Sequence, residues 1–187
     1  MRGVKLLIVL LFLITAGYYV YFSNSSMDKK IVSNDEGIRV ETPDSQWEFD
    51  SQERLEKSGT IVKISSDMEG PFKVFSNSVS LALGDVAAEL SSKSRDDSLS
   101  PEAKRVISEY GCAANYLNRN TASLMTIPSD QDVAQDLESL QKGDTVSFYG
   151  QEVNVSSAQY KGNSIDQQMK KMNSKQNIVL IKNVNIQ

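Results

Sequence analysis

The chain has 187 residues, of which 40% are hydrophobic and 24% charged, a composition typical of a globular protein that can bury a core. The formal net charge is -4, and without the first 22 residues, which contain two basic residues and no acid, 18 basic and 24 acidic residues leave -6. Nucleic-acid binding relies on Lys and Arg that displace counterions from phosphates. We therefore expect no nucleic-acid partner.

The residue inventory also excludes several kinds of site. The chain contains no histidine, so a catalytic triad with a histidine base is impossible. Its single cysteine, Cys112, can form neither an intramolecular disulfide nor a cysteine-rich zinc site. We interpret Cys112 as a small buried apolar side chain, with an intermolecular disulfide or a reactive thiol as alternatives. No cofactor and no metal site are predicted.

The first residues predict a membrane segment. Arg2 and Lys5 precede an uncharged run of seventeen residues, LLIVLLFLITAGYYVYF, which as a helix just reaches across a bilayer core. Tyrosines near its end suit the membrane interface. We predict a transmembrane anchor within residues 1–22, with these membrane-contacting residues: Leu6, Leu10, Leu13, Tyr18, Tyr19 and Phe22.

A cleaved signal peptide is the alternative interpretation of this segment, because Ala16 and Gly17 form a small pair where a peptidase could cut. Ile14 at the -3 position makes that a poor cleavage site. A buried soluble helix is disfavoured, since the run has no polar stripe. A short basic tail normally stays inside, so we expect a single-pass inner-membrane protein with its C-terminal domain on the periplasmic side.

After the anchor, polar residues 23–36 predict a flexible linker, and residues 37–187 predict one mixed α/β domain. β-branched, alternating segments predict strands in IRVE (38–41), TIVKI (60–64) and FKVF (72–75). We expect Trp47 and Phe49 to cap the core from a connecting loop, with an aromatic binding platform as the alternative.

The middle of the chain predicts both element types. SVSLALGDVAAEL predicts a strand, a turn at Gly84 and a helix, followed by an exposed loop, SSKSRDDSLS. Pro101 then begins a second helix, with Ser100 as N-cap. Its buried stripe is predicted to comprise Val106, Ile107 and Tyr110.

Residues 122–155 carry the clearest local signals. SLMTIP predicts a strand ended by Pro128, after which Ser129 caps a helix with Asp132 at the capping-box position. Val133, Leu137 and Leu140 share one face of that helix. We expect Gly143 to stop it, Asp144 to begin a turn, and two antiparallel strands to meet around Gly150.

Residues 156–176 predict a long hairpin connection or a frayed helix around Ile165, Met169 and Met172. The lysines there, Lys170, Lys171 and Lys175, are interpreted as a solvated face. NIVLIKNVNI predicts a central strand near the C-terminus. Together these elements predict an α+β fold: a small, mainly antiparallel, OB-like and partly open β-barrel with one or two helices, preceded by a single transmembrane helix.

The passage TIPSDQDVAQDLESLQKGDTVSFYGQEVNV resembles a family of small, uncharacterised, membrane-anchored bacterial proteins, whose pattern is an IPAD-like strand end, a helix and G-D-x-V-x-hydrophobic-x-G-x-x-V. The matching residues are Ile127, Pro128, Ser129, Asp130, Gly143, Asp144, Val146, Gly150 and Val153, and Ser78 to Gly84 is similar to a second stretch of that family. Ser123 and Met125 stand where the family tends to have Asn and His, and its late T-R-x-D-T-G-x-G-A-C-E segment has no counterpart. The resemblance implies fold and location only.

Two functions follow as hypotheses. The first is an envelope binding or accessory protein without catalytic activity, whose partner is another envelope protein or a peptide, with a glycan as the alternative. The second is a carboxylate-dependent envelope hydrolase, in which two acids would divide the general acid and base roles. Its candidate residues are Asp85, Glu89, Asp130, Asp132 and Asp144.

Overall fold

A computed structural model describes residues 29–34, 37–66, 68–93, 98–167, 169 and 177–187. The predicted anchor, residues 1–22, lies outside these ranges, as do Met172 and the three lysines interpreted as a solvated face. Within the described ranges, no helix has the length and apolarity needed to cross a bilayer.

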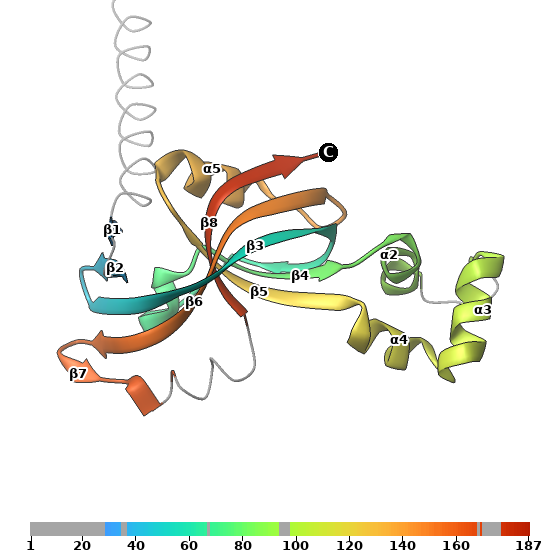
Figure 1. Ribbon diagram of the computed structural model, residues 1–187, viewed down its shortest axis with the longest axis horizontal. Coiled ribbons are helices and arrows are strands. Elements are labelled where there is room, and N and C mark those ends of the chain that lie inside the picture. The colour runs from blue at the N-terminus through green and yellow to red at the C-terminus, as the bar shows by residue number, and fades with distance from the viewer. Residues whose placement is uncertain (1–28, 35–36, 67, 94–97, 168, 170–176) are drawn as a thin grey trace, which may run out of the picture.

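The fold is a mixed α+β structure, mostly sheet, in which the sheet comes round on itself to form a partly closed ring (Figure 1). Five strands form this ring in the order β3 (Ser45–Ser65), β4 (Asn77–Ala82), β5 (Thr121–Pro128), β8 (Asn177–Ile186) and β6 (Thr145–Tyr160). Strand β6 pairs back onto β3 along most of its length. The β5–β8 pair is parallel, and the other ring pairs are antiparallel.

Strands β3 and β6 are long and continue beyond the ring as a two-stranded ribbon. On the ribbon, β2 (Gly37–Thr42) pairs with the first part of β3, and β1 (Lys30–Asn34) pairs with β2. At the other edge, β7 (Asn163–Ser164) pairs with the end of β6. The folded domain therefore includes residues 30–34 of the predicted linker, which form a strand.

Two hydrophobic cores lie on opposite faces of the sheet. Side chains from all five ring strands and one helix form the ring core, which includes Ile61, Leu81, Leu124, Leu137, Phe148 and Ile181. The second core lies beneath the ribbon and includes Trp47, Phe49, Phe75, Ile127, Met169 and Leu180. Because alternate side chains of β5 and β8 enter different cores, both strands are apolar on both faces, as their nearly continuous hydrophobic sequences require.

Trp47 and Phe49 occupy β3 rather than a connecting loop. Trp47 is 0% exposed, its ring stacks on Phe49 at a centroid separation of 5.9 Å, and it meets the ring of Phe75 edge-on at 5.3 Å. Their spacing of two on a strand directs both side chains into the second core. The predicted contribution of both rings to a core is therefore confirmed, whereas their predicted loop position is wrong and the alternative of an exposed aromatic platform does not hold.

The segment predicted as strand 72–75 is instead a 3-10 helix, η1 (Gly70–Val74). Pro71 fixes φ and lacks an N–H that a strand ladder would use, which favours the helical turn. Val74 and Phe75 still reach the second core. The main-chain oxygen of Phe75 accepts a hydrogen bond from Lys29 Nζ at 3.2 Å, and burial lowers the pKa of that ammonium group.

Helix α5 (Gln131–Ser139) packs Val133 and Leu137 into the ring core. Its N-cap is Asp130, whose carboxylate accepts a hydrogen bond from Val133 N at 2.9 Å. Ser129, the predicted cap, instead donates its hydroxyl to that carboxylate. The predicted start was thus one residue early, and Asp132 is an exposed first-turn residue.

Of the three predictions made for the segment after α5, the one for Asp144 is confirmed, and those for Gly143 and Gly150 are wrong. The turn at Asp144 is present, since its carboxylate accepts from Gln141 N at 2.7 Å. Gly143, with φ +103°, belongs to this turn, because the helix has already ended at Ser139. Gly150 is not a hairpin turn but lies inside continuous β6, where a Cβ would be 2.1 Å from the main-chain oxygen of Leu180.

Candidate functional site

Between β4 and β5, the described residues 83–93 and 98–120 contain three α-helices that project from one end of the molecule, away from β1 and β2 (Figure 1). We call this part of the chain the helical arm. Its helices are α2 (Asp85–Ser92), α3 (Pro101–Tyr110) and α4 (Ala113–Arg119). A small core of its own joins them, formed by Val86, Leu90, Leu99, Ala103, Ile107, Ala113, Tyr116 and Leu117.

A hydrogen-bonded cluster fixes α2 against the start of α3. Ser100 is the N-cap of α3, as predicted, and its hydroxyl oxygen accepts from Ala103 N at 3.1 Å. The carboxylate of Glu89 accepts from the Ser100 N–H at 2.7 Å and its hydroxyl at 2.6 Å, and from Lys93 Nζ at 2.7 Å. The bonds from Lys93 and then Ser100 lower the pKa of Glu89 to about 2.

A sharp turn brings α3 and α4 together at Gly111, which has φ +79° and ends α3. Such a left-handed conformation favours glycine over other residues. Cys112 follows it and is exposed, so the predicted buried apolar side chain is wrong. Its side chain makes no N-cap hydrogen bond for α4.

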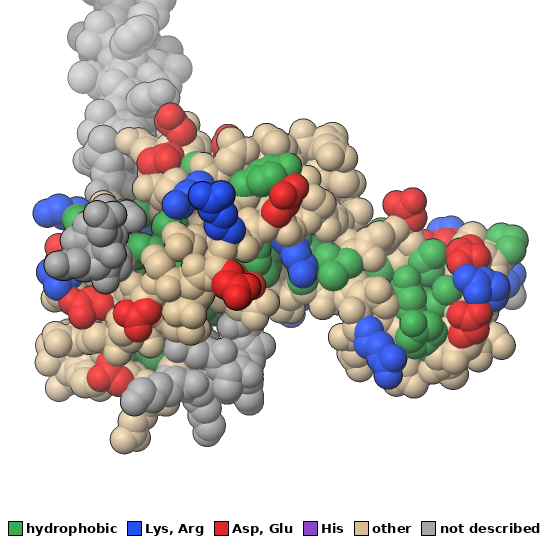
Figure 2. All heavy atoms as spheres, viewed as in Figure 1, with side chains coloured by type: hydrophobic (Ala, Val, Ile, Leu, Met, Phe, Trp, Pro, Cys, Tyr) green, Lys and Arg blue, Asp and Glu red, His purple; other side chains and the backbone are tan. Residues whose placement is uncertain are grey.

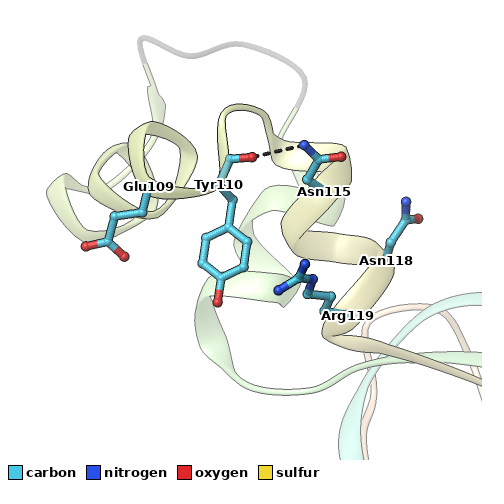
Figure 3. Close-up of a pocket in the computed structure, with 5 residues that line it drawn as sticks. All are labelled: Glu109, Tyr110, Asn115, Asn118 and Arg119. Carbon is cyan, nitrogen blue, oxygen red and sulfur yellow. Dashed lines mark hydrogen bonds between the residues drawn. The ribbon is translucent and has the colours of Figure 1, made fainter.

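A pocket of about 500 Å³ lies where the end of α3 faces α4 (Figure 3). We call it the arm pocket; its lining residues are Glu109, Tyr110, Asn115, Asn118 and Arg119. Asn115 Nδ2 donates to the main-chain oxygen of Tyr110 at 3.0 Å. The Arg119 guanidinium lies over the Tyr110 ring, 5.7 Å from its centroid.

The charges around this pocket are unevenly paired. Arg105 forms ion pairs with both Glu102, at 2.6 Å, and Glu109, and these raise the pKa of its guanidinium above the usual range, Glu102 most strongly. The pocket's acid, Glu109, therefore has a cationic partner, which it shares with Glu102. In the described part of the chain, Arg119 has the Tyr110 ring as a partner and no carboxylate.

The outer surface of the arm is mixed in character. Figure 2 shows hydrophobic side chains gathered on one face of the arm, with acidic and basic side chains at the border. Tyr110 contributes to the exposed aromatic character, because it is only half-buried and meets Tyr116 edge-on at 5.2 Å. Aromatic and arginine side chains are enriched where proteins recognise partners.

The acids proposed for a hydrolase lie on different elements. Asp85 and Glu89 belong to α2, Asp130 and Asp132 to the start of α5, and Asp144 to the turn before β6. Of these, Glu89, Asp130 and Asp144 accept hydrogen bonds that hold local backbone in place. The described residues contain no group of three or more His, Cys, Asp or Glu side chains that could hold a metal ion.

Sequence reasoning assigned no role to the arm pocket. Helix α4 was not predicted, because it has no polar N-cap side chain and only seven residues. Gly111 after Tyr110 was the one local signal that a turn ends α3 there. The predicted motif residues lie elsewhere, at the end of β5, at the start of α5, in the turn before β6 and in β6 itself: Pro128, Ser129, Asp132, Gly143, Asp144 and Gly150.

Comparisons with known proteins identify no relative: no family model, no curated protein and no solved structure matches this chain.

Proposed function

We propose that this chain is a membrane-anchored binding or accessory protein of the bacterial cell envelope. In this proposal, residues 1–22 anchor it in the inner membrane in a single pass, and the domain lies on the periplasmic side, where it binds another envelope protein or a peptide. The anchor rests on the uncharged apolar run from Leu6 to Phe22. The family resemblance of the Ile127–Val153 passage favours the same location.

We further infer that the ring is an OB-type barrel. An OB fold is a five-stranded, partly open Greek-key barrel. Here five strands form the ring, its first and fourth strands in chain order, β3 and β6, pair with each other, and α5 lies between the third and fourth. Such barrels serve as scaffolds that carry recognition surfaces on their faces and loops.

The helical arm carries this proposal. It is an insertion that the ring does not need for closure, since β4 and β5 pair with each other directly. It nevertheless has its own small core and ion pairs, and it presents Tyr110 and Arg119 at an open pocket. A folded insertion that exposes aromatic and arginine side chains is typical of a recognition element.

The proposal includes no reaction. Carboxylate catalysis needs two acids whose environments separate their pKa values at one site. Glu89 lies on the arm, whereas Asp130 and Asp132 lie at α5, and Glu89 and Asp130 both have lowered pKa values through hydrogen bonds with structural roles. A general acid in a hydrolase requires a raised carboxyl pKa instead.

Site-specific crosslinking in intact membranes tests the proposal. When the full-length protein carries a photoreactive amino acid in place of Asn118, on the arm, we expect it to capture an envelope protein or a peptide. The same substitution at exposed Asn154, on β6, is the matched control and should capture little. Protease added to sealed spheroplasts should digest the domain.

Three results would contradict the proposal. Full-length chain could remain in the soluble extract after gentle lysis, the domain could resist external protease until the membrane is opened, or the two crosslinker positions could give the same products. The first two would remove the anchor and the location. The third would remove the arm as the recognition element.

A further inference from the structure

We propose that the arm pocket binds the C-terminal carboxylate of a peptide, with Arg119 as the residue that contacts it. This inference deepens the proposed function and rests on it, because it names the chemistry by which the arm would recognise a partner. The pocket's volume, about 500 Å³, lies within the range of small-ligand pockets and suits a few terminal residues of a peptide.

The first argument is electrostatic. The pocket has one acid, Glu109, and one base, Arg119, yet they do not pair with each other in the structure. Glu109 is held by Arg105 on the preceding turn of α3. A carboxylate arriving at Arg119 thus meets a guanidinium whose charge no described acid neutralises. Planar guanidinium groups bind carboxylates through two parallel hydrogen bonds.

The second argument concerns the orientation of Arg119. Its guanidinium lies 5.7 Å from the centroid of the Tyr110 ring, and Tyr116 meets that ring edge-on. Stacking on an aromatic face restricts the guanidinium, so less side-chain entropy is lost when a ligand binds. With one face covered by Arg119, the Tyr110 ring is poorly placed as a stacking platform for a sugar.

The third argument concerns the amides. Asn115, Asn118 and Arg119 lie at positions i, i+3 and i+4 of α4, and all three line the pocket. Figure 3 shows the side chains of Asn115 and Arg119 directed toward Tyr110, whereas Asn118 projects from the other side of α4. Asn115 donates through Nδ2 to Tyr110, which leaves its side-chain oxygen to accept from a peptide N–H. Among described residues, the side-chain amide of Asn118 has no hydrogen-bond partner. A peptide terminus supplies an N–H and a C=O next to its carboxylate.

Another hollow among the described residues is less suitable for an anion. Its volume is about 340 Å³, and the turn between β2 and β3 forms most of its wall. The lining residues include Glu41 and Asp44 but no Arg or Lys. Two acids at that turn would repel a carboxylate. The arm pocket is therefore where we place the peptide terminus.

Binding is tested by NMR on the full-length chain in detergent micelles. The probe is acetyl-trialanine with a free carboxylate, and its C-terminal amide serves as the matched ligand. We expect the free acid to shift the Asn118 amide and Arg119 Nε signals with a Kd on the order of 1 mM, because the site is exposed. The amide ligand should bind about tenfold more weakly or worse.

Three variants test whether peptide binding depends on the positive charge of Arg119 itself or only on the total positive charge of the arm. Arg119→Gln should weaken binding of the free acid by about tenfold or more. Lys104→Gln removes the same charge from an exposed position of α3 outside the pocket, and should leave the Kd within about twofold. Arg105→Gln should weaken binding although it does not line the pocket, since Glu109 then loses its cationic partner.

The inference is overturned if the amide binds as tightly as the acid, if Arg119→Gln and Lys104→Gln behave alike, or if chitotriose shifts the same signals while the peptide does not. Unchanged signals from the α2 and α3 core in Arg119→Gln confirm that the variant remains folded. The crosslinking experiment at Asn118 distinguishes the two proposals. Capture of an envelope protein that Arg119→Gln does not reduce would contradict the carboxylate site and leave the proposed function standing.

Discussion

Adding one methyl group at Gly150 should destabilise the whole domain. A Cβ at this position would lie 2.1 Å from the main-chain oxygen of Leu180, whereas ordinary contact begins at 3.4 Å. The obstacle is backbone of β8, which cannot rotate away, so β6 and β8 would have to separate by about 1.3 Å there. Ladder hydrogen bonds stretched by that amount are lost.

The magnitude follows from what the separation breaks. Losing about two ladder hydrogen bonds beside Gly150 would cost about 1 kcal/mol each. Overpacking of the adjoining ring core costs about 1 to 3 kcal/mol more. Gly150→Ala should therefore lower the free energy of unfolding by about 3 to 5 kcal/mol, enough to unfold a marginally stable domain.

Urea unfolding measures this effect through Trp47, the chain's single tryptophan, which is 0% exposed in the second core. The matched control is Ser156→Ala, at an exposed position of the same strand, which should change the free energy by less than about 0.5 kcal/mol. A Gly150→Ala protein within about 1 kcal/mol of the parent would refute the close approach of β6 and β8.

Three further outcomes are expected. Asp130→Ala should cost about 1 kcal/mol in chemical denaturation, because the Val133 N–H loses its cap; an unchanged midpoint would contradict the cap. Glu89 has a folded pKa of about 2 against an ordinary 4.5, so the stability it contributes is present above about pH 4.5 and lost as pH falls toward 2. Glu89→Gln should therefore flatten the pH dependence of arm stability in that interval, measured by amide hydrogen exchange, and a profile parallel to the parent's would contradict this. Cys112 is exposed in the folded chain and should react with a maleimide without denaturant, whereas protection until unfolding would contradict its position.

Predictions from the sequence were accurate where local chemistry decides the outcome. Ser100 followed by Pro101 determines the start of α3, and Pro128 marks the end of β5, because capping and the missing proline N–H act within a few residues. The turn at Asp144 is equally local. The N-cap of α5 was misplaced by one residue, since Ser129 and Asp130 are both good caps and their sequence does not rank them.

The wrong predictions concern positions whose structure depends on contacts with strands that are distant in the sequence. Gly150 next to alternating residues is typical of a turn, but its role is to admit the backbone of Leu180, thirty positions later in the sequence. Ring closure depends likewise on β3 pairing with β6, with Ser58 opposite Ser147. The arm pocket required a turn at Gly111 and an uncapped short helix, neither of which periodicity reveals.

The contact between Lys29 and Phe75 limits how far the domain can lie from the membrane. If residues up to Phe22 lie in the bilayer as proposed, only residues 23–28 separate the bilayer from Lys29, whose side chain is bonded to the domain. A chain of that length extends at most about 25 Å. The domain would therefore stay close to the membrane surface, and a partner would have to be embedded in that membrane or approach within a few tens of ångströms of it.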